Sequence, residues 1–263
     1  MRQEFESTIP ADDPVRAEAQ LGGWVTSFSD QILDIFAAVF DFVAIDTQHS
    51  SISETQAATL LDRLRHYEKP IVVRVAKNDR ARIGRMLDCG ADTIIVPLVE
   101  SADQAREAVR SCFYPPYGER SYGAIRGDLR GKSPGELSAG VRCFVQIETE
   151  LGMRNAEEII STPGLSGVYV GPTDLSISHG LDPAKAFDSP QLQGHFAELR
   201  TLCDRYDVIL GSHTLDEHSA RLFTSWGADF VLAAHDSALI WSAARRAQAA
   251  LRGTGSVDAG PVY

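Results

Sequence analysis

Short apolar runs alternate with longer segments of helical periodicity along most of the chain. The runs are mostly continuous rather than alternating, which is typical of strands buried on both faces of a parallel sheet. Eight such runs are found, at residues 24–28, 41–46, 70–76, 92–99, 143–148, 167–171, 208–213 and 229–235.

The segments between the runs carry helix signals. In the segment that begins at Ser53, this serine can cap a helix and Gln56 completes a capping-box pair. The segment "DRARIGRMLDCGAD" has one apolar face and ends at Gly90, a typical helix stop. Eight strand–helix units in 263 residues predict an α/β fold, a single-domain closed (β/α)8 TIM barrel. A doubly wound open sheet is the alternative, but no glycine-rich dinucleotide fingerprint follows the first run.

Three segments depart from this alternation. Residues 113–140 are too long and too rich in glycine and proline for a simple connection, and we interpret them as a functional loop or lid. Residues 1–20 form a polar leader and residues 253–263 a flexible tail. The barrel is therefore expected to occupy residues 21–252.

Composition and charge exclude several functions. A net charge of −11 disfavours nucleic-acid or anionic-membrane binding, because both need a basic surface. No apolar run is long enough to span a bilayer. The four cysteines are far apart and lack metal-ligand spacing, which is typical of a reduced, cytoplasmic protein; they are Cys89, Cys112, Cys143 and Cys203.

Candidate catalytic groups stand where the apolar runs end, because barrel enzymes take their active site from the carboxyl ends of the strands. The second run ends in Asp46, followed by Gln48 and His49. Arg74 lies inside the third run, where a buried guanidinium needs an anion. That anion is either a neighbouring carboxylate or a substrate carboxylate, and both interpretations stay open.

Two carboxylates follow neighbouring runs. Glu148 ends the fifth run and Asp174 comes shortly after the sixth. With no cysteine or histidine close by, they suit a hard divalent cation that keeps positions open for substrate and water. On spacing alone, two helix-capping residues are an equally good interpretation. His213 and His235 also end runs, so they are further candidates for substrate contact.

Six motifs in order give the chain a family resemblance: "FDFVAIDTQHS", "VVRVAKND", "MLDCGADTIIVPLVES", "YPPYGERSYG", "VQIETELGMRNAEEI" and "GVYVGPTDLSISHG". Over residues 21–250 the chain resembles the HpcH/HpaI aldolases, metal-dependent class II pyruvate aldolases typified by 4-hydroxy-2-oxoheptane-1,7-dioate aldolase. The resemblance implies a (β/α)8 barrel, usually a homohexamer in which dimers exchange their last helix. It also implies cleavage or formation of a carbon–carbon bond next to a metal-bound pyruvate enolate.

The resemblance assigns roles to the candidate residues. It implies that Glu148 and Asp174 bind Mg²⁺, Mn²⁺ or Co²⁺, and that Arg74 holds the pyruvate oxygens. It makes His49 the acid/base group or the anchor of a catalytic water, supported by Asp46 and Asp88. The implied substrates are a 4-hydroxy-2-oxo acid, or pyruvate and an aldehyde. The implied substrate-binding residues also include Gln48, Gln146, Gly171, Pro172, Thr173 and Asp174.

The sequence departs from the family pattern at Gln48, where the pattern has glutamate, and at Ser121, where the common form has glycine. Arg126, Arg130 and Lys132 follow in the same loop and either meet a distal acid group of the substrate or are simply solvated.

Two other functions are kept in view. One is a related CoA-ester lyase or oxaloacetate-type decarboxylase. The other is a non-catalytic barrel, although such a protein is expected to have lost a ligand or the histidine. Trp241, in the last predicted helix, is a candidate for an oligomer interface.

Overall fold

The computed structural model describes residues 19–183, 187 and 189–252. All neighbouring strands are parallel, and β1 pairs with β8, so that the sheet closes into a barrel. The predicted (β/α)8 fold is therefore confirmed, and the open-sheet alternative is wrong. The strands are β1 Gln20–Val25, β2 Phe42–Asp46, β3 Ile71–Arg74, β4 Thr93–Val96, β5 Arg142–Ile147, β6 Gly167–Val170, β7 Ile209–Ser212 and β8 Phe230–His235.

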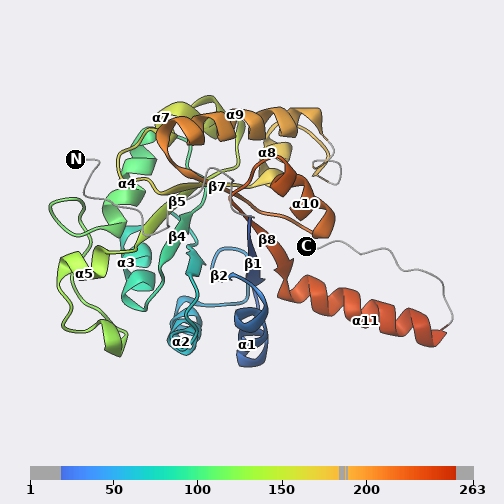
Figure 1. Cartoon of the computed structure of the whole chain (residues 1–263), viewed down its shortest axis with the longest axis horizontal. Coiled ribbons are helices and arrows are strands. Elements are labelled where there is room, and N and C mark those ends of the chain that lie inside the picture. The colour runs from blue at the N-terminus through green and yellow to red at the C-terminus, as the bar shows by residue number, and fades with distance from the viewer. Residues whose placement is uncertain (1–18, 184–186, 188, 253–263) are drawn as a thin grey trace.

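Helices connect the strands around the outside of the barrel (Figure 1). The Ser53–Gln56 capping box is formed, and Asp79 caps the next helix through the amides of Ala81 and Arg82. The helices are α1 Asp30–Val39, α2 Glu54–Leu64, α3 Arg80–Asp88, α4 Ala102–Cys112, α5 Pro134–Ser138, α6 Glu150–Arg154, α7 Ala156–Ile160, α8 Pro172–Ser178, α9 Pro190–Tyr206, α10 Glu217–Ser225 and α11 Asp236–Arg252.

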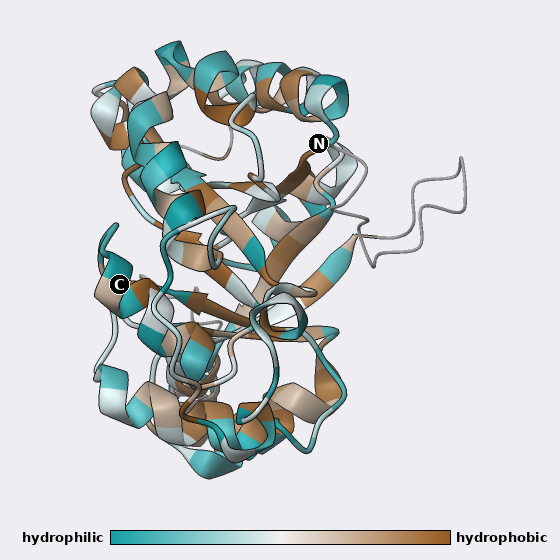
Figure 2. Ribbon diagram, turned by 90° about the vertical axis from the view of Figure 1, so that its left-hand side faces the viewer, coloured by the Kyte–Doolittle hydropathy of each residue, from teal (hydrophilic) through white to brown (hydrophobic). Residues whose placement is uncertain are grey.

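The strands separate two apolar layers. The outer layer packs the strands against the helices, which alternate between apolar and polar residues in Figure 2. The inner layer fills the barrel with a second cluster, in which aromatic rings predominate. Glycines make room for these rings, since a Cβ atom at Gly211 would lie 2.0 Å from Phe230 and one at Gly22 2.1 Å from Phe42. The inner cluster consists of Trp24, Phe42, Ala44, Val72, Ile95, Phe144, Tyr169, Phe230 and Leu232.

The inner layer determines which residues reach the carboxyl end of the barrel. Side chains along a strand alternate between its two faces. Because Ala44, Val72 and Phe144 point inward, the residues two positions later do so as well. These are Asp46, Arg74 and Gln146. These polar side chains of the predicted site therefore lie directly above the apolar core that fills the barrel, at its carboxyl end.

The first strand differs from the prediction. It was expected at residues 24–28, but β1 begins at Gln20 and ends at Val25. Its two central glycines, Gly22 and Gly23, weaken the apolar signal while accommodating neighbouring aromatic rings. Thr26 and Ser27 lie beyond the strand and donate their backbone N–H groups to the Asp236 carboxylate.

Residues 113–140, the segment interpreted as a functional loop or lid, lie at the amino end of the barrel, opposite the predicted site. Helices of this fold run antiparallel to the strands, so the segment after α4 begins at the amino end of the barrel. The backbone N–H groups of Ile125 and Arg126 donate to the Asp88 carbonyl at the end of α3. The segment contains a short 3-10 turn, Gly127–Leu129, and α5. Within one chain, the segment that we interpreted as a functional loop or lid therefore lies at the amino end of the barrel.

Helix α11 points away from the barrel (Figure 1). Of its residues, only Asp236 and Ala249 are buried, whereas Leu239, Ile240 and Trp241 are exposed. No helix among the described residues is both long and apolar enough to cross a membrane. Most of the predicted leader and all of the predicted tail, residues 1–18 and 253–263, lie outside the described residues.

Candidate active site

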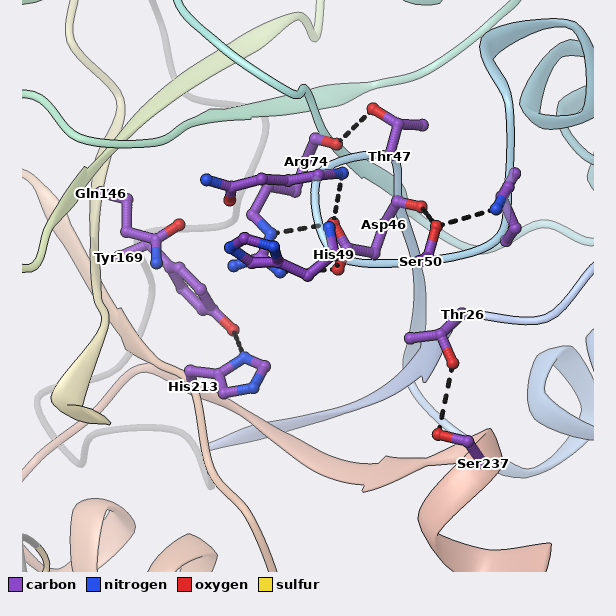
Figure 3. A network of polar contacts seen from close by, with 12 residues as sticks. Thr26, Asp46, Thr47, His49, Ser50, Arg74, Gln146, Tyr169, His213 and Ser237 are labelled. Atoms are coloured by element: carbon purple, nitrogen blue, oxygen red, sulfur yellow. Dashed lines mark hydrogen bonds and ion pairs between the residues drawn. The ribbon is translucent and has the colours of Figure 1, made fainter. Parts of the chain in front are cut away.

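The carboxyl end of the barrel brings together most of the predicted site residues. Asp46, Arg74 and Glu148 come from the ends of β2, β3 and β5. Gln48 and His49 follow β2, and Asp174 lies in the first turn of α8, after β6. Figure 3 shows the centre of this region, where Asp46, Arg74, His49 and Gln146 lie near one another.

Arg74 is held by the carboxylate of the neighbouring strand. Its Nε and Nη2 atoms donate to the two Asp46 oxygens at 2.9 and 2.6 Å, and both side chains are buried. The strand register makes Asp46 and Arg74 direct partners. The guanidinium also lies 4.8 Å above the centre of the Trp24 ring. Asp46 is therefore the anion that the sequence required, and Trp24 fixes the plane of the guanidinium.

Asp46 also shapes the loop that carries His49. Its oxygens accept the backbone N–H groups of Gln48 at 2.9 Å and His49 at 3.3 Å. Its carbonyl accepts the Ser50 hydroxyl, which in turn accepts the Ile52 amide. Asp46 thus supports the His49 backbone, while the exposed imidazole points toward Arg74 in Figure 3. Asp46 therefore supports His49 through the backbone of the loop, and no hydrogen bond between Asp46 and the His49 imidazole is recorded among the described residues.

Glu148 is a buried carboxyl group with a second one beside it. Its Oε1 accepts the Leu98 amide at 2.9 Å, and its Oε2 accepts the Gln146 side-chain amide at 2.5 Å. The charge of the Asp174 carboxylate acts on Glu148. Burial, reinforced by the Asp174 charge and opposed by Leu98 and Arg74, raises the pKa of Glu148 to about 7.

The donor set fits a hard divalent cation. Two adjacent carboxylates repel each other, and a cation between them would offset that repulsion. Three more oxygens of predicted site residues are buried without a hydrogen-bond partner among the described residues: Gln48 Oε1, Gln146 Oε1 and Thr173 Oγ1. Across the described ranges, no cluster of three or more His, Cys, Asp or Glu side chains could hold a metal. A cation here would therefore use Glu148 and Asp174 and leave its other positions to water or substrate oxygens.

Gly171 allows this close approach. A Cβ atom at this position would lie 2.7 Å from Glu148 Oε2 and 2.8 Å from Gln146 Nε2. The Gly171 amide already donates to the Ile147 carbonyl, and Pro172 has no N–H group. Of the implied substrate-binding residues 171–174, only Thr173 and Asp174 therefore keep a backbone N–H group for a substrate oxygen.

Some predicted residues do not belong to this site. Asp88 ends α3 at the amino end of the barrel, where its carboxylate accepts Arg120 Nη2 at 2.7 Å. Within one chain it does not meet His49, so its predicted supporting role is wrong there. Arg126 pairs with Asp128 and the Gly90 carbonyl at the same distant end. The predicted contact of this basic loop with substrate is wrong within one chain as well.

Other site residues were missed from the sequence. Trp24 was not among the predicted site residues, yet its ring lies against the Arg74 guanidinium. Tyr169 was not considered, although its hydroxyl lies 2.8 Å from His213 Nδ1. The inward alternation of β6, in which Tyr169 precedes Gly171 by two residues, was the available signal. Leu98, whose amide binds Glu148, has a left-handed φ of 55°, and nothing in the sequence indicates this.

Comparison with known proteins agrees with the barrel fold. The family model described as HpcH/HpaI aldolase/citrate lyase matches residues 20–243. The chain belongs to this family, and it is an enzyme of the lyase kind. The resemblance inferred from the six motifs is thereby confirmed.

Individual relatives align along nearly the whole chain. A 4-hydroxy-2-oxo-heptane-1,7-dioate aldolase from Escherichia coli is 32% identical and covers 93% of both chains. A 2-dehydro-3,6-dideoxy-6-sulfogluconate aldolase from Pseudomonas putida is 31% identical, covering 93% of this chain and 97% of its own. The crystal structure of an HpcH/HpaI aldolase from Desulfitobacterium hafniense is 25% identical, has a TM-score of 0.81, and covers 93% and 96% of the two chains.

Proposed function

We propose that the protein is a divalent-metal-dependent aldolase that cleaves a 4-hydroxy-2-oxo acid into pyruvate and an aldehyde, or forms it from them. The observation that carries this proposal is the buried Glu148 carboxyl group, on which the charges of the exposed Asp174 carboxylate and the buried Arg74 guanidinium both act. A divalent cation bound there would supply positive charge opposite the enolate oxygen of pyruvate. The fixed guanidinium adds to the same field.

Arg74 and the neighbouring amides orient the pyruvate half. Asp46 occupies the Nε and Nη2 atoms of Arg74, which leaves Nη1 for a substrate oxygen. The Thr173 and Asp174 amides, in the first turn of α8, receive the substrate carboxylate. Gln146 fixes Glu148 through its amide nitrogen and offers its own oxygen to a water or a substrate hydroxyl.

His49 handles the proton in this proposal. Cleavage requires removal of a proton from the 4-hydroxyl group, and an imidazole works in the right pH range. Its loop is fixed by Asp46, the same carboxylate that fixes Arg74. One carboxylate therefore orients both the guanidinium and the backbone of the loop that carries the base.

The alternatives have less support. A CoA-ester lyase needs a basic groove at the mouth for nucleotide phosphates, but the 120–132 loop lies at the amino end of the barrel. A non-catalytic barrel does not explain why Arg74, Glu148, Asp174 and His49 are all present. Relatives of nearly equal identity are named for two different aldolase substrates, so the aldehyde must be sought in this chain's own residues.

One experiment tests the proposal directly. Metal-stripped protein is reloaded with Mg²⁺, Mn²⁺ or Co²⁺ and assayed for pyruvate release from a panel of 4-hydroxy-2-oxo acids and from oxaloacetate. We expect release only after reloading. Full activity in excess chelator, or no release with any metal and substrate, would contradict the proposal.

We also propose a homo-oligomer that uses α11, a hexamer built as a trimer of dimers. Over most of its length α11 does not pack on its own barrel, and it carries exposed Ile240 and Trp241 (Figure 1). Helix α1, which precedes β2, exposes Ile35 and Val39. Exchange of α11 between two copies would cover apolar surfaces of this kind.

A further inference from the structure

The loop between β4 and α4, residues 97–101, lies against the end of β5 and the residue that follows it. The Leu98 N–H group donates to Glu148 Oε1 at 2.9 Å, and the Val99 N–H group donates to the Gln146 carbonyl at 3.2 Å. The first of these bonds fixes one oxygen of the carboxyl group that we propose as a metal ligand. The position of this loop therefore decides where Glu148 Oε1 points.

Leu98 adopts a backbone conformation that leucine does not favour. Its φ is 55°, in the left-handed region, where the Cβ atom of an L-residue crowds the backbone. The side chain is 53% exposed, so it gains little from packing in this conformation. The bond to Glu148 stabilises the left-handed conformation. Unless the rest of the loop is anchored, relaxation of Leu98 would turn its N–H group away from that carboxylate.

Glu100, two residues after Leu98, provides such an anchor. Its Oε1 accepts the Thr149 hydroxyl at 2.8 Å, and its carbonyl accepts the Asn155 side-chain amide at 2.7 Å. Thr149 directly follows Glu148 and caps helix α6. The Glu100 side chain thus joins the loop to the residue next to the proposed ligand.

The backbone of Glu100 is also tied to the start of α4. Its N–H group donates to Gln104 Oε1 at 2.7 Å. The Gln104 carbonyl in turn accepts the side-chain amide of Asn78, which lies between β3 and α3, at 2.9 Å. The segments that follow β3, β4 and β5 are therefore connected through Glu100 and Gln104.

Glu100 is not itself a ligand of the proposed cation. In the part of the chain that the structure describes, no three or more His, Cys, Asp or Glu side chains are grouped so that they could hold a metal ion. Glu100 is therefore not a third carboxylate beside Glu148 and Asp174, and one of its oxygens is already engaged with Thr149. Any effect of Glu100 on the cation has to act through the loop.

We propose that Glu100 is a positioning residue: it anchors the loop so that the Leu98 amide holds Glu148 Oε1 in the orientation that binds the cation. This inference rests on the proposed function, in which Glu148 is a metal ligand. Replacing a residue that orients a metal ligand weakens metal binding by about 10- to 100-fold. Loss of the Glu100 carboxylate should therefore weaken cation binding although both ligands remain.

The first test is calorimetric titration of the full-length, metal-free protein with Mg²⁺. Glu100→Ala removes the acceptor for the Thr149 hydroxyl, and we expect its Kd for Mg²⁺ to rise at least about tenfold. Glu100→Gln keeps an acceptor oxygen and should stay within about threefold of the wild type. Glu107→Ala removes an exposed carboxylate from α4 and is the matched control, which should bind Mg²⁺ like the wild type. An unchanged Kd in Glu100→Ala would overturn the inference. A loss of about tenfold in Glu100→Gln would overturn it too, because the charge would then act instead of the hydrogen bond.

A second substitution separates positioning from folding. Glycine adopts left-handed conformations without a steric penalty, so Leu98→Gly removes the strain that the anchor opposes. Added to Glu100→Ala, it should recover at least about threefold in Mg²⁺ affinity. General damage to the barrel would not be repaired by a glycine, which only adds freedom to the loop. Absence of any recovery would therefore contradict the positioning role.

A third measurement uses metal-free protein and does not depend on the aldolase proposal. The Leu98 N–H group should exchange slowly with D₂O in the wild type and at least about tenfold faster in Glu100→Ala, as followed by NMR. Unchanged exchange in Glu100→Ala overturns the inference, whatever the cation does. If exchange becomes faster but the wild type binds none of Mg²⁺, Mn²⁺ and Co²⁺, the proposed metal-dependent function is wrong, although Glu100 does hold Leu98.

Discussion

At the scale of single residues, Arg74 combines a structural and a chemical role. Lysine would keep the charge but lose the planar fork that binds Asp46 through two nitrogens. We expect Arg74→Lys to lose at least ~2 kcal/mol of transition-state stabilisation, more than about tenfold in kcat/KM. Steady-state kinetics measure this. Arg63→Lys, in an exposed ion pair with Asp34, is the control and should be unaffected. Wild-type kinetics in Arg74→Lys would leave only the structural role.

Glu148 is the residue on which metal binding depends. Replacing it by glutamine keeps the shape but removes one of the two carboxylates. We expect Glu148→Gln to lose Mg²⁺ binding in calorimetry and pyruvate release in the coupled assay, with an unchanged circular dichroism spectrum. Glu150→Gln changes an exposed carboxylate two residues away and should behave as wild type. Normal turnover of Glu148→Gln in excess chelator would contradict the metal site.

His235 should make the protein sensitive to acid. Its pKa is lowered by burial from 6.5 to about 4, so the folded state resists a proton that the unfolded chain accepts. This contribution to stability is complete above pH 6.5 and is lost as the pH falls through 4. Chemical denaturation of metal-free protein at pH 7 and pH 4 should show a smaller loss for His235→Gln, by up to about 3 kcal/mol. Equal losses in the two proteins would show that His235 is readily protonated in the fold.

The sequence identified those site residues whose position follows from strand alternation. Asp46, Arg74 and Glu148 end apolar runs, and barrel geometry sends such residues to one edge. Asp88 was assigned through the family resemblance alone, and a helix end places it at the opposite edge. The left-handed Leu98 could not be predicted, because leucine rarely adopts that conformation and only tertiary contact with Glu148 stabilises it.

Among the structural elements, the buried strands could be predicted because a parallel strand is covered on both faces and therefore has a continuous apolar run in the sequence. The first strand was predicted too late in the sequence, because Gly22 and Gly23 lack apolar side chains. In the structure these glycines make room for aromatic rings of other elements. The segment at 113–140 was predicted as a long loop, but its location depends on the direction of α4. Loop composition carries no information about which end of the barrel is covered.

The junction between β6 and α8 offers a test at this scale. At Gly171, a methyl group would collide with Glu148 and Gln146, so alanine must displace a metal ligand or the start of α8. We expect Gly171→Ala to weaken Mg²⁺ binding at least about tenfold, since outer positions that orient ligands have effects of this size. Gly84→Ala lies on α3, where an added Cβ atom meets nothing within 4 Å, and should bind metal normally. Unchanged affinity in Gly171→Ala would mean that the junction adapts.

At the scale of the whole molecule, barrel closure is what assembles the site. β2, β3, β5 and β6 provide the charged groups, and pairing of β1 with β8 brings Trp24 beside His235. These segments span most of the chain, so no shorter fragment contains the complete arrangement. The solid inner layer below them forces substrate to enter from the carboxyl end alone.

The exposed last helix gives the final prediction. Helix α11 leaves the barrel at β8 and presents Leu239, Ile240 and Trp241 to solvent, which is unfavourable for a lone chain. If a second copy covers this face, Ile240→Glu combined with Trp241→Glu places two charges in the interface. We expect this double variant to become smaller in light scattering after gel filtration, with unchanged circular dichroism. Gln248→Glu adds a charge at an exposed polar position of the same helix and should keep the wild-type mass. A monomeric wild type, or an unchanged mass in the double variant, would show that α11 does not mediate assembly.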